Sequence, residues 1–214
     1  MVPKEAYADS PGDCARDVGE SVCQSRHIPR RAAWRGVADG GGGVFLDDRL
    51  IVIGSSTGGV DALFAILPSL PKDAPPVLVV QHMPPAFTGS LARRLDGVCA
   101  VKVMEAHDRA PLERGTVYIA PGGDRHMILS GKIVRLIDGD RVSGHRPSVD
   151  MLFQSVAPLG RKAVGAILTG MGEDGAAGLL AMRQAGARTF GQDAQSCVVY
   201  GMPRAAAAMG AVER

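Results

Sequence analysis

Leu50-Ile51-Val52-Ile53-Gly54-Ser55-Ser56-Thr57-Gly58-Gly59 is the stretch that decides the fold. Its first half is apolar and has the length of a buried strand, and its second half is a glycine-rich turn. A helical pattern of apolar residues follows at Val60, Leu63, Phe64 and Leu67. Glycine allows the sharp bend, and the N-terminus of the expected helix points unpaired N–H groups at the turn. The stretch therefore predicts a strand, a turn and a helix that would stabilise an oxyanion or a phosphate.

Two functions fit this turn. Gly54-x-Ser56-x-Gly58 has the spacing in which a nucleophilic serine is exposed between a strand and a helix. A phosphate cradle is the alternative, because nucleotide-binding folds place a glycine-rich turn at the same position. No Lys follows the second glycine as a Walker loop requires, and the spacing is not Gly-x-Gly-x-x-Gly. A serine nucleophile needs a base and an orienting carboxylate, which the rest of the chain must supply.

The rest of the chain alternates strand-length apolar runs with helical patterns, and its 214 residues suffice for one α/β domain. We expect a doubly wound, mostly parallel sheet with helices on both faces and one antiparallel hairpin around Ser130-Gly131-Lys132. The predicted strands are Leu50–Ile53, Val77–Gln81, Val101–Met104, Thr116–Ile119, Met127–Leu129, Ile133–Ile137, Ala163–Leu168 and Arg188–Gly191. The predicted helices are Val60–Leu67, Pro85–Leu95, Val149–Val156, Ala176–Ala185 and Pro203–Met209.

Residues 1–46 differ in composition from the remainder. They are rich in Pro, Gly, Ser, Asp and Arg and include Gly40-Gly41-Gly42-Gly43. This composition is typical of a disordered tail with a flexible linker. The sequence thus predicts a tail at 1–46 and a folded domain at 47–214.

Composition excludes several classes of protein. The net charge of +2 and the sparse aromatic residues do not suggest a nucleic-acid-binding surface. No apolar run is long enough to span a membrane, and the N-terminus lacks the apolar region of a signal peptide. The four cysteines form no Cys-x-x-Cys pair, so we expect no metal site. The sequence predicts a cytoplasmic monomer that does not insert into membranes.

Two further strand ends carry residues that a serine nucleophile would need. His82 directly follows the predicted strand Val77–Gln81, and Asp174 lies in the glycine-rich loop after Ala163–Leu168. Sites in open α/β sheets lie at the carboxyl ends of the strands, so Ser56, His82 and Asp174 should share one edge. The three residue types form a hydrolase triad of nucleophile, base and orienting carboxylate. Their order differs from the Ser, Asp, His order of α/β-hydrolases, but triads are defined by geometry.

Simpler roles exist for each of the three. A lone His at a strand end is often a hydrogen-bonded structural residue. Ser56 and Asp174 could each cap the helix that follows. A non-catalytic or nucleotide-binding α/β domain that uses the glycine-rich turn therefore stays open as the alternative function.

Six blocks of the sequence resemble the catalytic domain of CheB-type protein-glutamate methylesterases, which are also protein-glutamine deamidases of bacterial chemotaxis. The resemblance runs from about Leu50 to about Val212. The blocks are Gly54–Gly59, Gln81–Pro84, Ala120–Gly122, His145–Asp150, Leu168–Gly175 and Gly201–Arg204. The serine, histidine and aspartate of the family fall on the three residues that the strand ends had selected.

The resemblance implies hydrolysis of glutamyl methyl esters, and deamidation of glutamines, on the cytoplasmic helices of methyl-accepting chemoreceptors, without a cofactor or a metal. Thr57 and a backbone N–H of Met171 are the implied oxyanion donors. Arg146 would pair with substrate carboxylates, or else form a structural ion pair. His126 and His145 are expected to be structural or rim residues, and His107 a solvated loop residue.

Two departures from the family pattern accompany the resemblance. CheB proteins usually carry an N-terminal receiver domain, but the 49 residues before Leu50 are too few for one. We therefore expect a methylesterase without a receiver, or the catalytic part of a longer chain. The chain also stops soon after the Gly201–Arg204 block, where the family leads us to expect a further helix.

Overall fold

Strands and helices alternate along the chain in the order that the apolar runs predict. The computed structural model describes residues 49–213, so the predicted tail at 1–46 lies outside the described residues. The strands are β1 (Leu50–Ser55), β2 (Val77–Gln81), β3 (Lys102–Glu105), β4 (Thr116–Ile119), β5 (Arg125–Ser130), β6 (Ile133–Asp138), β7 (Ala163–Ile167) and β8 (Arg188–Gly191). The helices are α2 (Gly59–Ile66), α3 (Pro85–Asp96), α4 (Val149–Val156), α5 (Ala176–Gln184) and α6 (Met202–Ala208), with short 3-10 turns at Leu67–Ser69 and Ala157–Lys162.

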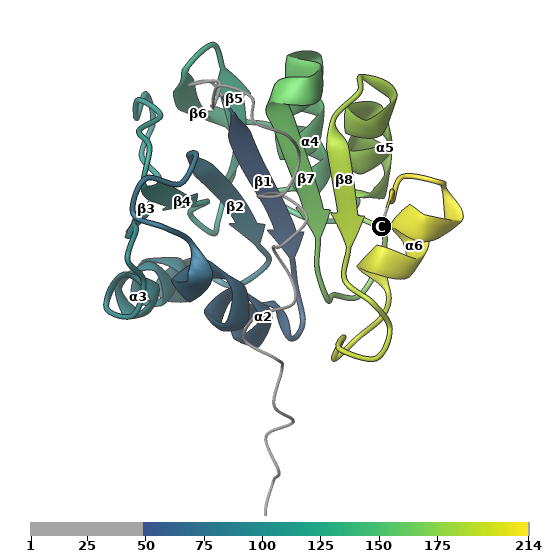
Figure 1. Ribbon diagram of the computed structural model, residues 1–214, viewed down its shortest axis with the longest axis horizontal. Coiled ribbons are helices and arrows are strands. Elements are labelled where there is room, and N and C mark those ends of the chain that lie inside the picture. Colours follow the sequence, from purple (N-terminus) through teal and green to yellow (C-terminus); the bar gives the residue numbers. More distant parts are fainter. Residues whose placement is uncertain (1–48, 214) are drawn as a thin grey trace, which may run out of the picture.

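The predicted elements are all confirmed, and their ends differ from the predicted ones by at most two residues. Six strands form one parallel sheet in the order β3-β4-β2-β1-β7-β8 (Figure 1). Strands β5 and β6 form the predicted antiparallel hairpin as a separate pair. The fold class is therefore the one that the sequence predicts.

Helices cover both faces of the sheet because side chains of a strand alternate between its two faces. In β1, Ile51 and Ile53 belong to the core under α2 and α3. Leu50 and Val52 belong to the second core, which α4, α5, α6 and the β5–β6 hairpin complete. A strand that is apolar on both faces is typical of a central strand in such a sheet.

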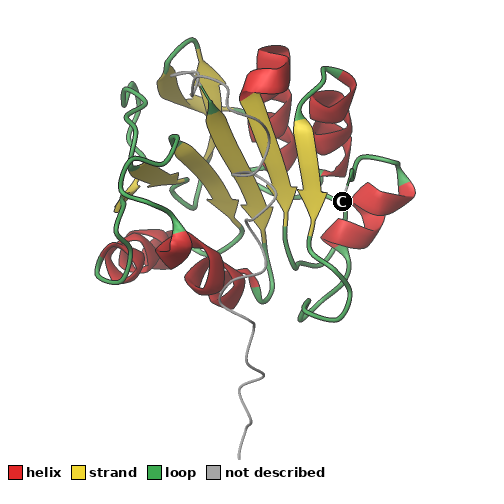
Figure 2. Cartoon of the chain, viewed as in Figure 1, coloured by secondary structure: helices red, strands yellow, loops and turns green. Residues whose placement is uncertain are grey.

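The chain reverses direction across the sheet next to β1. From β1 it runs to β2, then to the edge strand β3 and back inward to β4, and it later crosses to β7 and β8 on the other side of β1. The arrowheads of β2, β1 and β7 point to the same edge (Figure 2). Ligand sites of open α/β sheets form where the strand order reverses in this way.

No helix among residues 49–213 has both the length and the apolar character that a membrane span requires.

Candidate active site

Ser56 lies immediately beyond β1, on the turn that leads into α2. Its N–H donates to the Thr169 carbonyl at 3.0 Å, and its own carbonyl accepts from Gly59 N–H at 2.8 Å. The α2 helix begins after Gly58, whose φ of 80° is left-handed and whose position has no side-chain cap. Ser56 is therefore not the cap of α2, and its half-buried hydroxyl makes no hydrogen bond within the described residues.

Close packing of the two strand ends requires glycine beside Ser56. A Cβ at position 170 would lie 2.7 Å from the Cβ of Ser56, which is far inside van der Waals contact. The loop after β7 therefore passes directly against the turn that carries Ser56, and only a glycine allows this approach.

Gln81, the last residue of β2, ties this turn to the neighbouring strand. Its side chain is buried, with only 2% exposed. Its Nε2 donates to the carbonyls of Ser56 at 2.9 Å and His82 at 3.0 Å, and its Oε1 accepts from the Ser55 hydroxyl at 2.7 Å. Sequence reasoning assigned no role to Gln81. The available signal was a single amide at the end of the apolar run Val77–Val80.

His82 follows β2 and is fixed at both its backbone and its ring. Its N–H donates to the Ser55 carbonyl at 2.9 Å. Its ring Nε2 lies 2.8 Å from Oδ2 of Asp174, and the His82 side chain is 8% exposed. A carboxylate accepts, so Nε2 carries a proton, and in the neutral imidazole the lone pair is on Nδ1. That Nδ1 atom is buried and has no hydrogen-bond partner among residues 49–213.

Asp174 lies in the loop after β7, and its side chain is fully buried. Besides His82, three groups at the start of α4 donate to its carboxylate: the Ser148 hydroxyl at 2.7 Å, Val149 N–H at 2.8 Å and Asp150 N–H at 3.1 Å. Burial acts to raise the pKa of Asp174, but these hydrogen bonds outweigh it and hold the pKa below its ordinary value. Asp174 does not cap α5, because the capping position of α5 is Gly175.

The three predicted residues thus come from adjacent strands at one edge of the sheet. Ser55 pairs with Gln81 in register, which places Ser56 and His82 one residue beyond paired positions. On the other side, Leu168 N–H donates to the Gly54 carbonyl at 2.8 Å and starts the loop that carries Asp174. The side-chain contact between His82 and Asp174 completes the arrangement.

The backbone N–H groups of Thr57 and Met171, the two expected oxyanion donors, are unpaired within the described residues. Thr57 is exposed, and the Met171 side chain is 74% exposed. The Thr57 carbonyl accepts from the Thr169 hydroxyl at 2.9 Å, which joins the two turns behind these N–H groups.

Arg146 does not form the structural ion pair that the sequence offered as its alternative role. Its Nη1 donates to the Gly139 carbonyl at 2.5 Å, and its Nε is buried without a partner. No carboxylate among residues 49–213 pairs with it. The structural ion pair is therefore wrong for the described part of the chain, and the guanidinium keeps an uncompensated charge.

The other three histidines among residues 49–213 have different surroundings. His126 is buried; its Nδ1 accepts from Ser148 N–H at 3.1 Å and its Nε2 donates to the Asp140 carbonyl at 2.8 Å. His107 is exposed, as expected. His145 stacks on His82, with ring centroids 3.8 Å apart and ring planes 2° apart. Sequence reasoning did not predict this stack.

His82, His145 and Asp174 also lie close enough to raise the question of a metal, since one candidate ligand atom of each lies within 4.8 Å of the others. The donor geometry does not suit one. Parallel stacked rings direct their in-plane lone pairs side by side rather than toward a common point. Both oxygens of Asp174 already accept hydrogen bonds. The cluster fits proton transfer better than metal binding.

Comparison with known proteins identifies the family. The fold resembles the crystal structure of the Thermotoga maritima CheB methylesterase catalytic domain, with a TM-score of 0.73, 40% sequence identity, and coverage of 78% of this chain and 92% of that one. Residues 51–214 match the family model described as CheB methylesterase. The chain belongs to the CheB methylesterase family.

Relatives within the CheB family are similar over the same region. A protein-glutamate methylesterase/protein-glutamine glutaminase of Rhizobium johnstonii is 61% identical over 170 residues, which cover 78% of this chain and 49% of that protein. One from Dechloromonas aromatica is 54% identical over 187 residues, covering 86% of this chain and 53% of that protein. The chain thus spans about half of the length of the CheB relatives that it matches.

Proposed function

We propose that this chain is a serine hydrolase that removes methyl groups from glutamyl methyl esters of chemoreceptors and deamidates their glutamines. The observation that carries the proposal is the buried pair of His82 and Asp174, 2.8 Å apart, at the strand end next to Ser56. The names of the CheB relatives, protein-glutamate methylesterase and protein-glutamine glutaminase, supply the substrate class. Residues 47–214 would form the catalytic domain.

Each member of the triad has a defined part in this proposal. Asp174 holds the His82 proton on Nε2, which leaves the lone pair on Nδ1 to take the proton of the Ser56 hydroxyl. Ser56 Oγ then bonds to the ester carbonyl carbon and forms a tetrahedral oxyanion. The free N–H groups of Thr57 and Met171 would donate to that oxyanion.

Collapse of the intermediate breaks the bond to the leaving group. His82 returns its proton to the departing methoxide, so methanol leaves and a glutamyl ester of Ser56 remains. Water, deprotonated by His82, attacks this acyl-enzyme and releases Ser56 and a glutamate side chain. With glutamine as substrate the same steps release ammonia. Neither path requires a redox change or a cofactor.

Substrate binding would use the uncompensated charge of Arg146. Its guanidinium has no carboxylate partner within the described residues, and glutamates are common on the receptor helices that we expect as substrate. Those helices lie in the cytoplasm, so we propose that the chain works there, as a monomer. None of the comparisons supports the alternative of a nucleotide-binding domain.

Active-site labelling tests the proposal without a receptor. A fluorophosphonate should modify the 214-residue chain at Ser56, located by tandem mass spectrometry, and Ser56→Ala should abolish the modification. Ser130→Ala is the matched control, because Ser130 is an exposed serine at the hairpin turn. Methanol release from a methylated receptor fragment should fall by about 10⁴-fold or more in Ser56→Ala. A folded wild-type chain that neither labels nor releases methanol would overturn the proposal.

A further inference from the structure

We propose that His145 is a positioning residue for the base: its ring lies flat on His82 and fixes the plane in which the His82 imidazole transfers protons. The inference rests on the proposed function, because it assigns His82 the role of base. The stack has a centroid separation of 3.8 Å and an interplanar angle of 2°, so the two rings overlap face to face. Nothing in the triad itself requires a second histidine there.

A single hydrogen bond does not fix an imidazole. The contact between Nε2 and Asp174 Oδ2 holds one point on the edge of the His82 ring. The ring can still rotate about the line through that contact, and rotation would swing Nδ1 away from the Ser56 hydroxyl. No hydrogen bond restrains Nδ1 within the described residues. A flat neighbour pressed on the ring face removes this rotation, because any tilt would bring the two rings into steric overlap.

The segment that carries His145 is built to hold a ring in one place. Val142 and His145 exchange two backbone hydrogen bonds, at 3.1 and 2.9 Å, and close a two-residue turn. Both central residues have positive φ, 52° at Ser143 and 79° at Gly144, as in a type I′ turn. The His145 ring donates from Nδ1 to the Ser143 carbonyl at 2.7 Å, which fixes its own orientation.

The Val142–His145 turn is also linked by hydrogen bonds to the start of α4, which surrounds Asp174. The Ser143 hydroxyl donates to Oδ2 of Asp150 at 3.3 Å, and the N–H of Asp150 donates to Asp174. The start of α4 therefore supports both contacts of the His82 ring: the hydrogen bond at its edge with Asp174 and the stack on its face with His145. A neutral aromatic face also tolerates the positive charge that His82 carries after it accepts the Ser56 proton.

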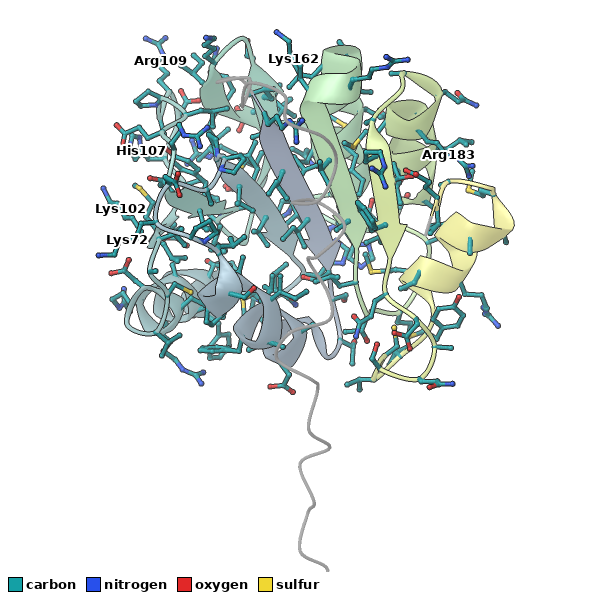
Figure 3. The ribbon with its side chains drawn as sticks, in the orientation of Figure 1. Lys72, Lys102, His107, Arg109, Lys162 and Arg183 are labelled. Atoms are coloured by element: carbon teal, nitrogen blue, oxygen red, sulfur yellow. The ribbon has the colours of Figure 1, made fainter. Side chains whose placement is uncertain are left out.

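The test compares two substitutions of His145 in the full chain. His145→Ala removes the ring face, whereas His145→Phe keeps a flat ring without the hydrogen bond to Ser143. We expect the fluorophosphonate labelling rate and kcat for methanol release to fall about 10- to 100-fold in His145→Ala, with KM nearly unchanged. His145→Phe should recover both rates to within about threefold of wild type, since the ring face is what positions the base. His107→Ala is the control: that histidine is exposed, on the β3 side of the molecule (Figure 3).

A spectroscopic readout separates positioning from a general loss of structure. In proton NMR of the histidine-labelled chain, the His82 ring signals are assigned as those that are present in the wild-type spectrum and absent from the spectrum of His82→Gln. Stacking should place them upfield in wild type and in His145→Phe, and they should move downfield in His145→Ala while the melting temperature stays close to that of wild type.

Two results would overturn the inference: wild-type labelling in His145→Ala, or a His145→Phe variant as slow as His145→Ala. Failure of the proposed function looks different, because the wild-type chain itself would then not label. In that case the NMR comparison still decides whether His145 holds the His82 ring.

Discussion

The turn after β1 and the turn after β7 share one backbone design and differ in how they treat their polar side chain. Each leads from a central strand into a helix, and each reaches that helix through a left-handed glycine without a side-chain cap, Gly58 at φ 80° and Gly175 at φ 96°. Ser56 in the first turn is half-buried and its hydroxyl has no partner in the described chain. Asp174 in the second turn is fully buried and accepts from four groups.

The difference follows from the chemistry that each residue is proposed to perform. A nucleophile must meet substrate, so its oxygen stays free and accessible. An orienting carboxylate must stay ionised and immobile, and burial would protonate it unless several donors stabilised the charge. The first turn is held instead by a neutral group, the buried amide of Gln81. The first turn is thus held by hydrogen bonds to a neutral amide, that of Gln81, and the second by hydrogen bonds to a charged carboxylate, that of Asp174.

Removing the charge of the second turn should have the largest effect. Asp174→Asn replaces the carboxylate, which only accepts hydrogen bonds, by an amide whose NH₂ group is itself a donor. The carboxylate charge that keeps the His82 proton on Nε2 is then lost. We expect kcat for methanol release to fall by about 10⁴-fold, because the base is then in the wrong tautomer. Asp108→Asn is the matched control, since Asp108 bonds Arg135 and Leu136 in the hairpin rather than His82. Equal activity of the two variants would contradict the assignment of Asp174.

The contributions of Asp174 and Gln81 to the free energy of unfolding should depend differently on pH. Gln81→Leu leaves the Ser55 hydroxyl without its buried acceptor, which should lower the free energy of unfolding by about 1–3 kcal/mol at every pH. The folded pKa of Asp174 is depressed, so its stabilisation is present above the unfolded pKa of about 3.9 and is lost as pH falls through the folded value.

Urea unfolding at pH 7 and near pH 3 measures this contrast. The deficit of Asp174→Asn relative to wild type should shrink in acid, whereas that of Gln81→Leu should stay constant. Carboxylates that do not contact Asp174 are present in all three proteins, so their effects cancel in the differences. Asp150 is different: burial raises its pKa, and the nearby charge of Asp174 raises it further, so part of the Asp174→Asn difference passes through Asp150. An Asp174→Asn deficit that is the same at both pH values would show that the carboxylate charge does not stabilise the fold.

The smallest effect separates backbone strain from crowding within the second turn. Gly172 has φ of 91° and open space around an added Cβ, so Gly172→Ala should cost only the left-handed strain, about 1–2 kcal/mol. Gly175 has φ of 96°, and an added Cβ would lie 2.5 Å from Cγ1 of Val149. Gly175→Ala should therefore cost about 1–3 kcal/mol more, from overpacking against the residue whose N–H holds Asp174. Urea unfolding of the two variants side by side gives the difference, and equal losses would rule out the crowding.

Much of the fold was predictable because its signals are local. The apolar runs of the central strands and the glycine-rich turns lie within short windows of sequence, so the elements were found with nearly correct ends. The hairpin was predictable for the same reason, from Ser130-Gly131-Lys132 between two short apolar runs. Ser56, His82 and Asp174 could be selected because each follows a predicted strand and parallel strands share one carboxyl edge.

The roles of their neighbours were not predictable, because each depends on contacts between distant segments. Gln81 looked like an ordinary strand end until its amide met Ser55 and Ser56, some 25 residues earlier in the chain. The alternative role of Arg146 was a structural ion pair, but the loop brings its guanidinium to the Gly139 carbonyl. His145 was expected at the rim, and the fold stacks it on His82.

The sequence by itself determined the alternation of strands and helices, the glycines of the sharp turns and the three residue types at the strand ends, because short-range patterns specify these features. Only the tertiary structure decided which nitrogen of His82 faces Asp174, that the start of α4 rather than α5 surrounds this carboxylate, and that His145 covers the ring. Hydrogen-bond direction and ring stacking depend on positions in space. A linear pattern does not contain those positions until the sheet brings its strand ends together.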